Sequence, residues 1–84
     1  MEANEIPLNQ LPVGKAAKVI ALISKGPGRR RILDLGITEG ARVEPLFPSP
    51  SGNPVAYLIR GAVIALRAED ASRVMVVAIK KEGK

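Results

Sequence analysis

The stretch ARVEPLFPSPSGNPVAYLIRGAVIAL, residues 41–66, contains three short apolar runs separated by turn residues. Its first run alternates apolar and polar residues at its start, as a half-buried strand does. The connector 48–54 is rich in proline and serine, and Arg60-Gly61 is a two-residue turn signal. The stretch therefore predicts three strands, joined by a hairpin with a long tip and then by a tight turn.

Two further apolar runs, one on each side of this stretch, bring the expected number of strands to five. Proline cannot donate a hydrogen bond to a strand ladder, so we expect the strand that holds Pro45 to lie at a sheet edge or to carry a bulge there. The fold class predicted is all-β, a small and strongly bent barrel of about five strands with two short helices. The expected strands are residues 16–23, 41–47, 55–59, 62–66 and 74–79.

The first expected helix, residues 29–35, is followed by Gly36 at the position that a left-handed cap favours. Ile32 and Leu35 are three residues apart and can both face the core. The second expected helix, residues 67–73, has acidic residues in its first turn, which is ordinary helix-dipole chemistry.

The first helix carries Arg29, Arg30 and Arg31 at its start, where the helix dipole is already positive. The dipole makes these charges destabilising, and pairs of Asp34 with Arg30 and Arg31 would offset about 0.3–0.5 kcal/mol of that cost each. The rest of the cost has no local compensation, which suggests that the arginines bind an anionic partner. The alternative is a solvated basic patch.

Composition excludes many functions. The chain has 84 residues, a net charge of +5, and neither cysteine nor histidine, which removes disulfides, the commonest zinc and iron ligands, and histidine-based catalysis. We therefore expect no enzyme, no cofactor and no metal site. One domain over residues 1–84 is expected, with its core at about 8–79 and a basic tail at 80–84.

The chain shows neither a secretory signal nor an apolar stretch of about 20 residues, so we expect a cytoplasmic protein without membrane insertion. Nucleic acid is the competing partner, because the chain is basic and carries an arginine run. However, Tyr57 and Phe47 are its only rings, and both are expected to pack within strands rather than stack on bases. No nucleic-acid partner is expected on that ground.

Several of these segments together resemble the ferrous iron transport protein A (FeoA) family, in order and spacing, over about residues 8–77. The resemblance implies an SH3-like β-barrel that acts as a cytoplasmic partner of the Feo-type ferrous iron permease, a membrane protein with a GTP-binding domain. Glycines at turns and caps fit this pattern: Gly14, Gly36, Gly40, Gly52 and Gly61. The matching segments are LPVGK (11–15), RILDLGITEGARV (31–43), GNPV (52–55), RG (60–61) and IALR (64–67).

The partner-binding surface is predicted from the dipole argument rather than from the resemblance. It comprises the first helix and the residue after its cap: Arg29, Arg30, Arg31, Leu35 and Ile37. Apolar residues flanked by arginines suit an interface with an apolar centre and a charged rim. Core packing is the alternative role of Leu35 and Ile37. Self-association through an open strand edge is also allowed by this fold.

Overall fold

The computed structural model describes residues 4–79, and the expected basic tail at 80–84 lies outside this range. Strands hold more of the described residues than helices do, as expected. The elements in chain order are β1 (Glu5–Pro7), the 3₁₀ turn η1 (Leu8–Gln10), β2 (Ala17–Leu22), α1 (Pro27–Asp34), β3 (Arg42–Pro48), β4 (Val55–Ile59), β5 (Ala62–Leu66), α2 (Ala68–Ala71) and β6 (Val74–Ala78).

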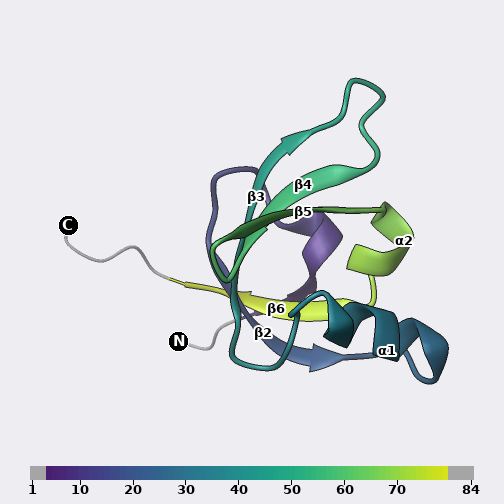
Figure 1. Cartoon of the computed structure of the whole chain (residues 1–84). Helices are drawn as coiled ribbons and strands as arrows, with labels where there is room; N and C mark the ends of the chain where they lie inside the picture. Colours follow the sequence, from purple (N-terminus) through teal and green to yellow (C-terminus); the bar gives the residue numbers. More distant parts are fainter. Residues whose placement is uncertain (1–3, 80–84) are drawn as a thin grey trace.

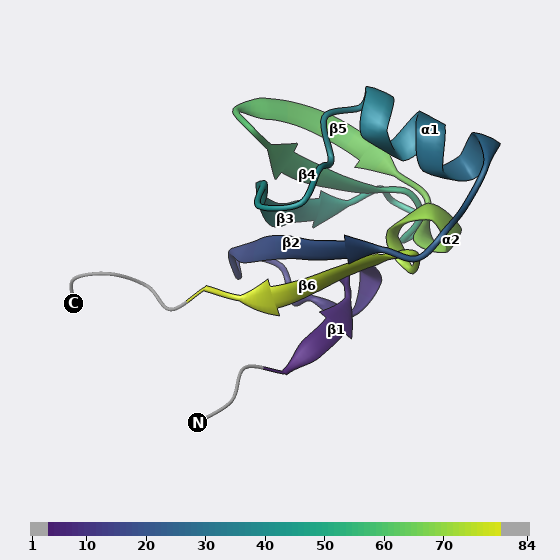
Figure 2. The ribbon, with the colours of Figure 1, turned by 90° about the horizontal axis from the view of Figure 1, so that it is seen from below.

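All six strands form one antiparallel sheet in the order β1-β6-β2-β3-β4-β5. The sheet bends sharply where β2 meets β3, because these two strands share only the pairs Ala17↔Val43 and Lys18↔Arg42. The second half of the sheet, β3-β4-β5, therefore stands over the first half (Figures 1 and 2). The predicted all-β class is confirmed.

The hairpin predicted from residues 41–66 forms as expected, with β3 paired to β4 and β4 paired to β5. Arg60 and Gly61 both have positive φ, 51° and 86°, as a tight two-residue hairpin turn requires. The register shifts between Pro45 and Phe47, which confirms the expected bulge. The alternative of an edge strand is wrong, because β3 lies between β2 and β4.

One strand escaped the sequence analysis. β1 holds three residues, Glu5, Ile6 and Pro7, and such a segment has neither the length nor the alternation that predicts a strand. It becomes extended by pairing with β6, at the far end of the chain. Its strand character thus comes from a non-local partner.

The core lies between the two halves of the bent sheet. Tyr57 belongs to it, and burial raises the pKa of its phenol. Phe47, expected to pack, is instead 58% exposed. The buried apolar residues are Leu8, Leu11, Ala17, Val19, Ile32, Ile37, Ala41, Val43, Tyr57, Ile59, Leu66, Ala71, Val74 and Val76.

Helix α1 ends at the expected glycine. Gly36 has φ +92°, its amide donates to the carbonyl of Leu33 at 2.9 Å, and the amide of Ile37 donates to the carbonyl of Ile32 at 3.3 Å. These two bonds define a Schellman cap, in which the residue after the glycine packs on the last turn of the helix. Ile32 and Ile37 are accordingly both buried.

Two glycine-to-alanine substitutions test how the backbone uses these residues. Gly61→Ala should destabilise the fold by about 1–2 kcal/mol, because alanine resists positive φ even where there is space for its Cβ. Gly28→Ala, within α1, should instead stabilise it by up to about 1 kcal/mol, since an added Cβ makes only ordinary contacts there. Urea unfolding of the two variants measures both effects; equal shifts would contradict the assignment of the turn.

Candidate functional site: the groove between α1 and β5

Helix α1 places its arginines on the surface and one side chain in the core. Arg29, Arg30 and Arg31 are all exposed, whereas Ile32 is the one buried residue of the helix. Pro27 stands at the start of the helix, where its missing amide costs nothing. The alternation of exposed and buried residues thus orients the arginine side chains outward.

The two apolar residues predicted for partner binding have different environments. Leu35 is 37% exposed, so it remains accessible on the surface and does not face the core as Ile32 does. Ile37 is fully buried, and its assignment to an exposed contact surface is wrong. The reason is the Schellman cap, which turns the residue after Gly36 back onto Ile32. A glycine cap at 36 was the sequence signal for this packing.

The helix begins two residues earlier than expected, and this changes its electrostatics. Arg29 and Arg30 fall in the first turn, which contains no acidic residue, so the helix dipole disfavours both charges. Arg31 falls in the last turn, where the dipole favours a cation. The unfavourable placement therefore concerns two arginines, not three.

Arg31 pairs with a different carboxylate from the one expected. Its Nη2 lies 2.6 Å from Oδ1 of Asp70, on α2, and this bond joins the two helices across 39 positions of sequence. Asp34 is exposed and takes part in no ion pair within residues 4–79. Asp70 was assigned only to helix-dipole chemistry, because no local spacing indicates so distant a pair.

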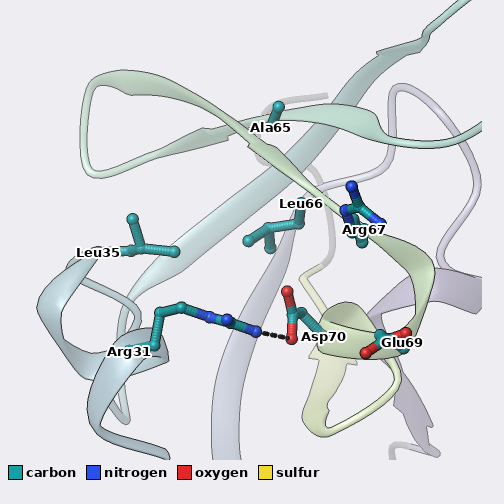
Figure 3. A pocket seen from close by; sticks show the side chains of 7 residues that line it. All are labelled: Arg31, Leu35, Ala65, Leu66, Arg67, Glu69 and Asp70. Carbon is teal, nitrogen blue, oxygen red and sulfur yellow. Dashed lines mark hydrogen bonds and ion pairs between the residues drawn. The ribbon is translucent and has the colours of Figure 1, made fainter. Parts of the chain in front are cut away.

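A shallow groove of about 500 Å³ separates α1 from β5 and α2. Figure 3 shows Arg31 reaching from α1 towards Asp70, with the Leu66 side chain pointing into the space between the elements. Leu35 closes the groove on the α1 side (Figure 3). The lining residues are Arg31, Leu35, Ala65, Leu66, Arg67, Glu69 and Asp70.

Five arginines line the groove or lie on or beside helix α1, which borders it, and we call them the basic face: Arg29, Arg30, Arg31, Arg67 and Arg73. Arg67 lines the groove itself. Arg73 lies beside the first turn of α1, since its Nη1 is 3.9 Å from the position that a Cβ on Gly28 would occupy. Within the described chain, Arg31 is the one member of the basic face in an ion pair. Sequence analysis missed Arg67 and Arg73, which only the fold brings beside α1.

Within residues 4–79, no three acidic side chains lie close enough together to hold a metal ion. No helix in that range has the length and apolar character needed to cross a membrane. What the groove offers chemically is an apolar floor with two guanidinium groups and two carboxylates, of which Arg31 and Asp70 pair with each other.

Comparison with known proteins decides the family. The FeoA domain profile matches residues 6–78, nearly the whole described structure. The chain belongs to the FeoA domain family. A fusion of Fe(2+) transport protein A with the Fe(2+) transporter FeoB, from Porphyromonas gingivalis, is 32% identical over 69 residues. That match covers 82% of this chain but only 8% of the fusion protein.

Two solved structures confirm the SH3-like fold of this FeoA-family chain. An FeoA-like protein from Clostridium acetobutylicum is 28% identical, with a TM-score of 0.85, covering 100% of this chain and 96% of that one. FeoA from Stenotrophomonas maltophilia, solved in complex with zinc and described as a prokaryotic SH3 domain protein, is 29% identical. Its TM-score is 0.73, with 82% of this chain and 86% of that chain covered.

Neighbouring arginines of α1 should differ in their effect on stability. Arg31→Gln removes the bond to Asp70 and should cost about 1 kcal/mol, the upper end of the range for surface pairs, because the Asp70 side chain is only 13% exposed. Arg30→Gln, the matched control, should be neutral or slightly stabilising, because it removes a cation from the positive end of the helix. Chemical denaturation measures both; a larger loss for Arg30→Gln would contradict this description of α1.

Proposed function

We propose that this chain is a non-enzymatic, cytoplasmic accessory protein of ferrous iron uptake, which binds a Feo-type permease through its basic face and groove. The observation that carries the proposal is the Porphyromonas gingivalis relative, in which an FeoA segment and the transporter FeoB are one polypeptide. Fusion raises the effective concentration of one part for the other, which is advantageous when the two parts act together.

The donor atoms of the chain favour protein contact over metal transport. Ferrous iron is commonly held by histidine, cysteine or clustered carboxylates, and this sequence contains no histidine or cysteine. Within residues 4–79 the carboxylates do not cluster either. An accessory role in transport therefore requires a contact with the protein that carries the iron.

The groove has the anatomy of a small protein interface. Leu35 and Ala65 supply an accessible apolar centre, and the arginines of the basic face supply a charged rim. Interfaces of this kind concentrate their binding energy at the centre, while the rim charges guide association. An acidic partner surface is the complement of such a face.

Nucleic acid is the competing anionic ligand for the same arginines. Phe47 is the only exposed ring of the chain, since Tyr57 is buried, and one ring does not make a stacking platform. Binding to nucleic acid would thus depend on phosphate contacts and would weaken steeply with salt. Titration with duplex and single-stranded oligonucleotides at two salt concentrations distinguishes this alternative.

The direct test is retention of the tagged chain by a detergent-solubilised Feo-type permease at moderate salt, with and without GTP. Wild-type protein should be retained, and Arg30→Glu should weaken binding about tenfold because it reverses a rim charge. Lys18→Glu is the matched control: it makes the same change of charge on β2, outside the groove, and should bind normally.

Either of two results would contradict the proposal. If the permease does not retain the wild-type chain and oligonucleotides bind it tightly, the ligand of the basic face is nucleic acid. Equal weakening by Arg30→Glu and Lys18→Glu would show that net charge, rather than the basic face, governs association. Retention that depends on GTP would indicate that the chain contacts the GTP-binding domain of the permease.

A further inference from the structure

The free edge of β5 forms one side of the groove. β5 is the last strand of the sheet, and it pairs with β4 on one side only. Figure 3 shows β5 and α1 on opposite sides of the groove, and Ala65 and Leu66 of this strand line it. A groove between an edge strand and a helix is the geometry in which several domains bind an extended peptide as an added strand.

The register shows which backbone groups of β5 are free. The two-residue turn at Arg60-Gly61 makes Ile59 and Ala62 a hydrogen-bonded pair, and such pairs alternate along an antiparallel ladder. The amides and carbonyls of Ala62, Ile64 and Leu66 therefore point to β4. Those of Val63 and Ala65 point to the open edge, and within the described chain no backbone group bonds to them.

The two edges of the sheet differ in protection. β1, at the opposite edge, has three residues, and among them are the charged Glu5 and Pro7, two devices that discourage strand addition. β5 has five residues, none of them charged and none a proline. Its Val63 side chain is 62% exposed. The edge that adjoins the groove is thus the unprotected one.

The charges beside this edge indicate what would occupy it. Arg67 follows β5 directly and lines the groove, as do Arg31, which is paired with Asp70, and Glu69. The first-turn arginines belong to α1, the helix that borders the groove, and do not line it. An incoming strand with acidic side chains complements Arg67 and the excess of arginines on α1, and its apolar side chains would meet Leu35 and Ala65. A second copy of this chain is a poorer occupant, because it brings the same net charge of +5 and the same arginines.

We propose that the open edge of β5 binds an extended segment of the permease partner, with alternating apolar and acidic side chains, as a seventh strand of the sheet. Two residues supply the backbone contacts, Val63 and Ala65, each with one donor and one acceptor. The inference rests on the proposed function and adds to it the mode of recognition. Backbone pairing supplies affinity, and the groove selects the sequence.

Paired substitutions at one edge position test backbone pairing. Val63→Pro removes the outward amide at an edge position, where proline is tolerated, and leaves the ladder with β4 intact. Val63→Ala keeps that amide and trims the side chain. Retention by the solubilised permease should fall about tenfold or more for Val63→Pro and change little for Val63→Ala. Circular dichroism and thermal unfolding verify that both variants fold.

Amide exchange on the wild-type chain provides the second test, which decides the matter if Val63→Pro fails to fold. In peptides that cover residues 61–66, the amides of Val63 and Ala65 should exchange quickly in the free protein, unlike those bonded to β4, and become protected in the complex with the permease. Peptides from β1 should be unaffected. Exchange in residues 61–66 that is unchanged by the permease would overturn the proposal.

Other outcomes would also contradict the proposed strand addition at β5. Normal retention of folded Val63→Pro, or equal losses for both variants at position 63, would exclude pairing through the backbone. A dimer of the free chain that Val63→Pro abolishes, seen by sedimentation, would assign the edge to a second copy. Wild-type chain that is not retained at all refutes the proposed function and the edge inference together, whereas retention with an unaffected edge refutes the inference alone.

Discussion

The packing of Ile32 against the cap at Gly36 and Ile37 is the constraint on which the functional surface depends. An eight-residue helix is too short to be stable in water by itself, and α1 has one buried residue with which to attach to the sheet. The Schellman cap adds Ile37 to this anchor, so that two buried isoleucines hold the last turn. The orientation of the arginines, and the distance of α1 from β5, follow from this attachment.

The arginines of α1 contribute little to folding, and their placement is better explained by binding. Two arginines occupy a turn in which the helix dipole opposes them. The pair of Arg31 with Asp70 is exposed on the arginine side, and a surface pair contributes about 0–1 kcal/mol to stability. Local preferences that conflict with the fold occur most often at functional sites. The groove thus lies between a helix rich in arginine and the uncharged edge of β5, which carries free backbone groups.

The sequence predicted the features that depend on local pattern. Five strands, two helices and the bulge at Pro45 followed from apolar runs and turn residues, and the resemblance to the FeoA family is confirmed by the domain match. It did not predict β1, which exists by pairing with β6, or the bond between Arg31 and Asp70. The prediction that Ile37 is a contact residue is wrong, because a glycine cap at Gly36 packs the next residue onto the helix. The pattern of a single sequence does not show which distant segments contact each other.

The central claim is that the groove between α1 and β5 is the surface that contacts the permease. Photo-crosslinking tests it most directly, with a photoreactive amino acid at Leu35 in the groove or, as a control, at Val13, which is 58% exposed and does not line the groove. The account predicts covalent capture of the solubilised permease from position 35 and none from position 13. Capture from position 13 alone, or equal capture from both, would contradict it.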